Sequence, residues 1–202
     1  MLVLDNACFI HFPKTGGTWV RQALLQAGVP FEDYTGNHAH IGYKECPFND
    51  RFRFAFVRHP VAYFRSYWQF KMTAGWDPDN AFDMECQTDD FERFVVDVTT
   101  RYPGGYGHNI VHALGEHDTE IDFIGRFEHL ADDLVRALQL CGTRFDEAKL
   151  RATRPRNVSN KHSYPVVFTQ ELKDRIVHAE RPMMARFGYE DAAIDVFNNY
   201  LI

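Results

Sequence analysis

The sequence has few of the features that mark a disulfide-bonded or zinc-binding protein. Its four cysteines are scattered over 202 residues without any CxxC spacing: Cys8, Cys46, Cys86 and Cys141. Disulfide frameworks and zinc sites use close and regular spacings, whereas this distribution is typical of reduced thiols in a cytosol. A cytoplasmic chain without a disulfide scaffold is therefore expected.

Long apolar runs are also missing. No stretch approaches the roughly 18 apolar residues of a membrane span, and residues 1–14 lack the basic region and cleavage site of a signal peptide. The formal net charge of −6 argues against general affinity for nucleic acid, because duplex binding needs many basic groups. We expect a soluble protein that has neither a membrane nor a nucleic acid as partner.

The chain contains no internal repeat, low-complexity tract or linker rich in serine or proline. A length of 202 residues suits one sizeable core and is short for two catalytic domains. A single domain over residues 1–202 is predicted. Its oligomeric state is left open.

Short apolar runs alternate with helical patterns along the chain. Strands are predicted at residues 8–12, 52–57 and 121–125. Helices are predicted at residues 16–28, 61–73, 128–141 and 169–184. Thr169 is the expected N-cap of the last helix. This alternation predicts an α/β fold with a central parallel sheet covered by helices on both faces, a three-layer α/β/α arrangement.

Charge is unevenly distributed over this pattern. Residues 77–97 hold eight acids against Arg93 alone, whereas residues 144–161 hold six lysines or arginines against two acids. Two solvated faces would explain the segregation. A basic rim at an anionic cofactor, facing an acidic lid, would explain it equally well.

The strongest local motif is the loop PKTGGT at residues 13–18, between the first strand and its helix. Ligands of parallel sheets bind beyond the carboxyl ends of the strands. Glycines let backbone N–H groups approach an anion, and the following helix points its positive end at the same place. The loop is not a Walker A motif, because Lys14 leads it and no GK[ST] follows. A phosphate cradle is predicted, with a merely tight turn as the alternative.

A second motif follows the next strand. Arg58 ends that strand, and Ser66 lies about two turns into the following helix. A guanidinium at a strand tip and a hydroxyl on the adjoining helix can converge on one phosphate, with the arginine supplying bidentate hydrogen bonds. The pattern therefore predicts a second anion site.

Together the motifs HFPKTGGTW (residues 11–19) and RHPVAYFRS (residues 58–66) resemble the two signatures of the sulfotransferase family. The resemblance implies a P-loop-like fold and 3′-phosphoadenosine 5′-phosphosulfate (PAPS) as sulfuryl donor, with 3′-phosphoadenosine 5′-phosphate (PAP) as product and no metal. It implies that Lys14 binds the bridging oxygen, that Arg58 and Ser66 bind the 3′-phosphate, and that Trp19 stacks on adenine. Trp19 is also a candidate core residue. The 5′ side would be cradled by Thr15, Gly16, Gly17 and Thr18.

In several branches of the family a histidine between the two motifs is the base. His38 is the first candidate here and His40 the second, although each is also a plausible surface histidine. A metal site built on these two, or on His108, His112 and His117, is disfavoured, since no carboxylate or cysteine lies at a supporting spacing.

The chain departs from the family pattern at two places. Phe127 stands where the family often has a tyrosine, which removes a hydroxyl near adenine. The Arg-Lys-Gly loop of the cytosolic small-molecule branch is also missing. The basic loop instead resembles the Asn-x-Ser loop of the carbohydrate-directed branch, or is a simple solvated loop: Arg154, Arg156, Asn157, Ser159 and Lys161.

The stretch after Trp68 is expected to be a long loop, rich in acids and aromatics. Its aromatic side chains would line an acceptor pocket or belong to the core. The expected acceptor is a neutral or cationic small molecule or a short saccharide, modified at a hydroxyl or an amine. Two other functions stay open: a P-loop phosphotransferase, and a nucleotide-binding module without turnover.

Overall fold

The computed structural model describes residues 1–34, 42–116, 119–154 and 164–189. Its contacts group into two compact units. We call residues 1–58 and 109–156 the sheet unit and residues 59–108 and 157–202 the helical unit. The prediction of one domain over 1–202 stays a prediction. None of the helices in the described ranges is long and apolar enough to cross a membrane.

In the part of the chain that the structure describes, five strands form one sheet in the order β3-β1-β2-β4-β5. The strands β2, β4 and β5, of which β5 is an edge strand, run parallel, with Phe9 paired to Phe54 and Ala55 to Ile124. The strand β1 pairs antiparallel with both β2 and β3. The five strands are β1 (Leu2–Val3), β2 (Ala7–Ile10), β3 (Glu32–Asp33), β4 (Phe52–Val57) and β5 (Phe123–Arg126).

The α/β class is therefore confirmed, but the sheet is mixed rather than wholly parallel. The prediction missed β1 and β3 because each is only two residues long, too short to show an alternating pattern. The central strand at residues 52–57 was predicted with its observed bounds.

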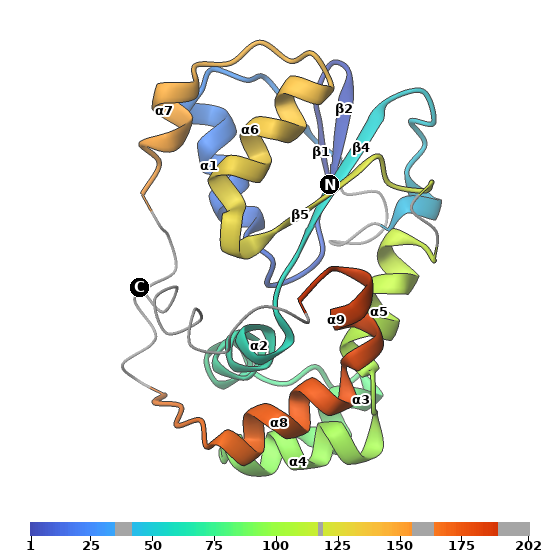
Figure 1. The fold of residues 1–202 in the computed structure, drawn as a ribbon, viewed down its shortest axis with the longest axis vertical. Helices are drawn as coiled ribbons and strands as arrows, with labels where there is room; N and C mark the ends of the chain where they lie inside the picture. Colours follow the sequence, from blue (N-terminus) through green and yellow to red (C-terminus); the bar gives the residue numbers. More distant parts are fainter. Residues whose placement is uncertain (35–41, 117–118, 155–163, 190–202) are drawn as a thin grey trace. The chain divides into compact units, whose positions relative to one another are not determined.

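Three helices of the sheet unit lie along one face of this sheet (Figure 1). They are α1 (Gly17–Gln26), α6 (Leu130–Leu140) and α7 (Glu147–Arg151). The rings of Phe9, Phe54 and Phe56 fill the space between the sheet and these helices, with Phe9 stacked on Phe54 at a centroid distance of 5.3 Å. Val20, Leu24 and other apolar helix residues complete this core. The burial of these side chains holds the ends of β2 and β4 in place.

The helical unit contains most of the stretch that was expected to be a long loop. Its helices are α2 (Pro60–Ala74), α3 (Ala81–Cys86), α4 (Phe91–Arg101), α8 (Gln170–Ala179) and α9 (Arg181–Arg186). Another helix, α5 (Gly105–Leu114), begins in this unit and ends in the sheet unit. Asn80 and Asp90 cap α3 and α4 by accepting backbone hydrogen bonds. The expectation of a long loop was wrong, because some of the acids that suggested it are helix signals.

The predicted helix 169–184 is two helices. Thr169 caps α8 as expected, accepting from the N–H of Leu172. Helix α8 ends at Ala179, and Glu180 separates it from α9, where Pro182 lies in the first turn and its missing N–H costs no helical hydrogen bond. Helix α8 packs against α4 and α2 (Figure 1).

Aromatic rings form the interior of the helical unit. Tyr63 stacks on Tyr106 with 3.7 Å between centroids, and Tyr67 lies parallel to Phe94. The rings of Trp76 and Phe82 also lie against Phe94. The aromatic residues considered for an acceptor pocket are thus partners in this cluster.

Candidate anion-binding site

The loop between β2 and α1 turns sharply at Lys14. This residue has a φ of +65°, in the left-handed region that side chains other than glycine rarely adopt, and Gly16 follows with a φ of +98°. The buried Thr15 hydroxyl donates a hydrogen bond of 2.7 Å to the carbonyl of Phe12. The turn carries the chain from the carboxyl end of β2 directly into α1.

The start of α1 has the composition of an anion site. Its N-cap is Gly16, which has no side chain to accept hydrogen bonds from the first turn, and that turn contains no acidic residue. The first N–H groups of a helix have no partner within the helix, and they carry the positive end of its dipole. An anion placed there would receive these hydrogen bonds.

Both glycines of the loop pack closely. A Cβ on Gly17 would overlap the imidazole of His11, and one on Gly16 would lie 2.7 Å from Leu130 and 3.1 Å from Phe127. Residues from α6 and from the turn before it thus press on the loop from one side, and His11 presses on the first residue of α1. Glycine is required at both positions because neighbouring side chains leave too little room for a Cβ, and at Gly16 also because of its positive φ.

Arg58 follows the last residue of β4, the strand beside β2. Because the two strands are parallel, their carboxyl ends share one edge of the sheet. The buried Arg58 guanidinium donates from Nη1 to the carbonyl of Lys14 over 3.2 Å. It also lies 4.0 Å from the ring centroid of Phe127, a cation–π contact. Phe127, which was noted in the sequence for its missing hydroxyl, is thus the ring on which the Arg58 guanidinium packs.

Two positive side chains therefore meet at the loop. Burial, and then the nearby charge of Arg58, lower the pKa of Lys14 to about 8. Like charges that lie together at a helix N-terminus favour the binding of an anion there. The chemistry available is the binding of a phosphate-like group and the stabilisation of negative charge that develops on it.

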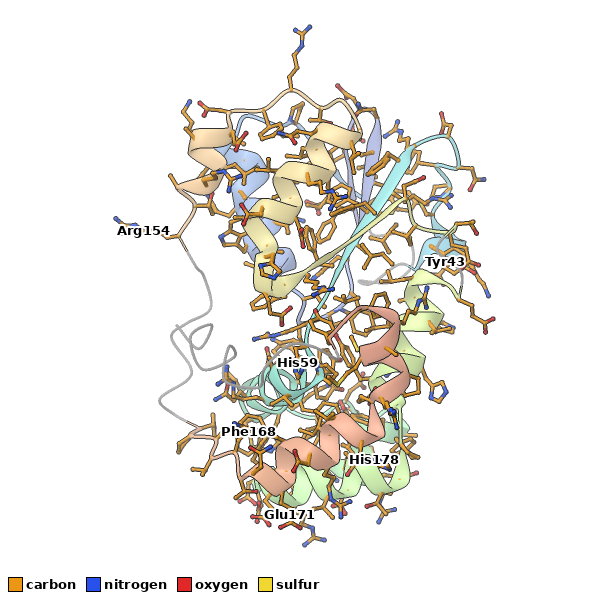
Figure 2. All side chains as sticks on the ribbon, viewed as in Figure 1. Tyr43, His59, Arg154, Phe168, Glu171 and His178 are labelled. Carbon is orange, nitrogen blue, oxygen red and sulfur yellow. The ribbon has the colours of Figure 1, made fainter. Side chains whose placement is uncertain are left out.

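The remaining predicted site residues are spread more widely. Thr18 is exposed, and Trp19 packs against the core while its Nε1 donates to the carbonyl of Thr153 over 3.2 Å. Ser66 lies half-buried on α2 of the helical unit. His38, His40 and Lys161 lie outside the described residues, as do Arg156, Asn157 and Ser159 of the basic loop. Arg154 is described and extends into solvent (Figure 2).

His59, the neighbour of Arg58 in the second motif, has a structural place. It is fully buried at the start of α2 (Figure 2), where its Nδ1 accepts a hydrogen bond of 3.2 Å from the N–H of Val61. Burial lowers its pKa to about 4. Its ring meets that of Tyr189 edge-on at 5.2 Å between centroids. His59 is thus a neutral N-cap.

Sequence reasoning missed the contacts that shape the loop. His11 was part of the first motif and Phe127 was noted for its missing hydroxyl, but neither was predicted to contact the loop, and Leu130 was not considered. A histidine just before a glycine-rich turn is the one local signal that was available. Among the described residues, no group of three or more histidine, cysteine, aspartate or glutamate side chains is arranged to hold a metal ion.

Comparison of the chain with family models, curated proteins and solved structures finds no match.

Proposed function

We propose that this chain is a sulfotransferase that transfers the sulfuryl group of PAPS to an acceptor hydroxyl or amine, on a P-loop-like three-layer fold. One observation carries the proposal more than any other. Lys14 and Arg58, at the ends of two neighbouring parallel strands, lie together at the N-terminus of α1. This arrangement suits a dianionic ligand, and the two motifs that supply it resemble those of the sulfotransferase family.

Lys14 and the first N–H groups of α1 would hold the 5′ side of the donor. When bound, PAPS supplies the sulfuryl group. The ammonium of Lys14 would stabilise the negative charge that grows on the leaving phosphate oxygen, an effect worth about 3 kcal/mol for one well-placed donor in a dry site. Its pKa of about 8 leaves it mostly protonated at pH 7 and suited to donating a proton.

Arg58 would bind the 3′-phosphate, a role that the resemblance gives to Ser66 as well. A guanidinium binds two phosphate oxygens in parallel, which fixes orientation as well as adding affinity. Phe127 would keep the guanidinium plane in position. The acceptor would be a neutral or cationic small molecule or a short saccharide, with His38 or His40 as its base. Thr15, Gly16, Gly17, Thr18, Trp19 and Lys161 remain the other proposed donor-binding residues.

A calorimetric titration with PAP, run beside ATP with magnesium, tests the proposal. Wild type should bind PAP and show no preference for ATP. Arg58→Ala should bind PAP roughly 100-fold more weakly, since a charged, bidentate hydrogen bond is lost. Arg136→Ala is the matched control: Arg136 is exposed on α6 and lies over Phe123, at the opposite end of β5 from the loop.

Each of the other functions has its own outcome in this test. Preference for magnesium ATP would replace the proposal with a phosphotransferase. Binding of PAP without release of PAP from PAPS, over a panel of hydroxyl and amine acceptors, would indicate a binding module without turnover. Equal weakening by Arg58→Ala and Arg136→Ala would show that the loop does not bind the ligand.

A further inference from the structure

Two consecutive polar residues on helix α2 of the helical unit (Figure 1), Arg65 and Ser66, are half-buried. Neither side chain forms a hydrogen bond, an ion pair or a ring contact with any residue in the ranges that the structure describes. Polar groups that are partly removed from water normally have such a partner, because a hydrogen bond offsets the cost of desolvation. A bound ligand can supply that partner here.

Arg65 differs in this respect from other half-buried arginines of the chain. Arg51 donates to the carbonyl of Leu4 over 2.7 Å, and Arg53 donates to the side chain of Asn49 over 2.5 Å. Burial alone lowers the pKa of the Arg65 guanidinium, since no carboxylate lies near enough to raise it. Its positive charge is therefore not neutralised by the described part of the chain.

Ser66 differs from other hydroxyls on helices. A serine or threonine within a helix can donate to the carbonyl four residues earlier. Thr73 on α2 and Thr99 on α4 do so, over 3.1 Å and 2.7 Å. Ser66 makes no such bond to the carbonyl of Ala62, or to any other group among the described residues. Its hydroxyl is thus available to a ligand.

The geometry of the helix brings these two side chains to one place. Residues three and four positions apart are neighbours on a helix surface, so Arg65 and Ser66 both flank Ala62. Ala62 carries only a methyl group, and a small ligand above it is within reach of both side chains. Gln69 lies one turn further along, where its Nε2 donates to the carbonyl of Tyr164 over 2.9 Å. The unpartnered polar groups are therefore confined to the turn at residues 62–66.

We propose that Arg65 and Ser66 bind a phosphate or sulfate group above Ala62 on α2. A guanidinium donates two parallel hydrogen bonds to such a group, and the hydroxyl can donate to a third oxygen, which a carboxylate does not have. Helix α2 contains no aspartate or glutamate that would repel the anion. Its other charged side chain, Lys71, is paired with Asp83.

Two sources can provide this phosphate or sulfate group. The resemblance gives Ser66 a role at the 3′-phosphate of PAPS, and Arg65 would add a charge to that contact; with this source the inference rests on the proposed function. The other source is a separate ligand that carries a sulfate or phosphate ester. The anion site itself is argued from α2 alone and stands with either source.

NMR spectra of the arginine Nε–Hε groups test the proposal residue by residue. The wild-type chain is titrated with sodium sulfate while sodium chloride keeps the ionic strength constant, and each signal is assigned by an Arg→Lys substitution. The Arg65 signal should follow a saturating curve at least roughly tenfold tighter than that of Arg175, an exposed arginine on α8 beside two threonine hydroxyls. Ser66→Ala should weaken sulfate binding at Arg65 about fivefold, since one hydrogen bond is lost.

Titration with PAP identifies the source of the anionic group. Shifts of the Arg65 and Arg58 signals over the same range of PAP concentration would assign it to the 3′-phosphate of the donor. A PAP shift at Arg58 alone, beside the sulfate shift at Arg65, would assign it to a separate ligand. A sulfate shift at Arg65 without any PAP shift at Arg58 would support this site and refute the function proposed for the loop.

Melting curves of Arg65→Met, with Arg175→Met as the matched control, provide a second measurement. In chloride, Arg65→Met should melt no lower than wild type, because the methionine keeps much of the packing and no hydrogen bond is lost. It should also lose the part of the sulfate stabilisation that Arg175→Met retains. The proposal is overturned if sulfate moves the Arg65 signal no further than that of Arg175. It is also overturned if Arg65→Met melts several degrees below Arg175→Met in chloride, which would show that the guanidinium has a partner within the chain.

Discussion

The sheet unit and the helical unit differ in what surrounds their buried charged groups. In the sheet unit, Lys14 and Arg58 meet at the loop, and their repulsion adds to the burial that lowers the pKa of Lys14. In the helical unit, the buried Asp83 accepts from the hydroxyl of Tyr67 at 2.5 Å and from the N–H of Asp77, and forms an ion pair with Lys71. The buried Glu180 accepts from two N–H groups at the start of α5.

This difference fits the proposal that the loop binds an anionic ligand, whereas the contacts of Asp83 and Glu180 stabilise the fold. Opposite charges and donors around a buried carboxylate offset its desolvation within the fold. Like charges that lie together at a helix terminus favour the binding of an anion there. Substitutions of these carboxylates should therefore change mainly the free energy of unfolding, and substitutions at the loop mainly the affinity for anions.

The largest effect is expected at Asp83. Asp83→Ala removes the partner of the Lys71 ammonium and of the Tyr67 hydroxyl, which should lower the free energy of unfolding by about 3 kcal/mol. Urea titration measures this. Asp79→Ala, an exposed carboxylate nearby, is the control and should change it by less than about 0.5 kcal/mol. Similar losses in both variants would contradict the distinction between the units.

At the loop, Gly17→Ala should cost about 2 kcal/mol of stability, because its Cβ overlaps the His11 ring. The double variant His11→Ala with Gly17→Ala should recover much of that loss, since the ring is gone. A double-mutant cycle by urea unfolding measures the coupling. Additive losses would show that the overlap is not the cause.

Affinity for PAP should depend on pH above neutrality. Burial and Arg58 lower the pKa of Lys14 to about 8, so the ammonium loses its proton between pH 7 and 9, and PAP affinity should fall roughly tenfold. Lys14→Arg keeps its charge and should give a flat profile by calorimetry. A flat wild-type profile would remove Lys14 from the site.

Without ligand, the lowered pKa of Lys14 makes the free energy of unfolding rise with pH, whereas the affinity for PAP falls with pH. Between pH 8 and the ordinary lysine value of 10.5, the unfolded chain keeps a proton that the folded chain has released. The free energy of unfolding of wild type should therefore rise over that window relative to Lys14→Met. Urea titrations at several pH values measure the difference, and a falling difference would contradict the assigned shift.

The smallest effect is expected at a helix cap. Thr169→Ala removes the hydroxyl that accepts from the N–H of Leu172, which should cost about 1 kcal/mol of unfolding free energy. Thr169→Asp should retain the cap and lose little. Affinity for PAP should be the same in both variants and wild type, and a change would show that α8 affects ligand binding.

Local signals account for what the sequence predicted well. Three features rest on apolar runs, glycines and proline, which act over a few residues: the strand at residues 52–57, the turn at residues 13–18, and a helix start at residue 61, one residue after the observed start of α2 at Pro60. The acids of residues 77–97 were misleading, because helix caps and solvated loops use the same side chains. Asp90 looked like loop and is an N-cap, although Phe91, Phe94 and Val98 already had helical spacing.

The contacts that complete the site depend on distant parts of the chain. Phe127 lies under Arg58, and Leu130 lies against Gly16, only because β5 pairs beside β4. The pattern of residues in a single sequence does not show which strands pair with each other. The register that places Arg53 beside Cys8 was equally hidden from the sequence.

The left-handed backbone of Lys14 has a consequence for engineering. Glycine adopts a φ of +65° without the clash that a Cβ brings, so Lys14→Gly would relieve about 1 kcal/mol of strain and would also remove a charge from beside Arg58. On both counts the variant should melt at a higher temperature. A selection for heat resistance alone would therefore discard the lysine, and thermostable descendants of this chain should be checked for its loss first.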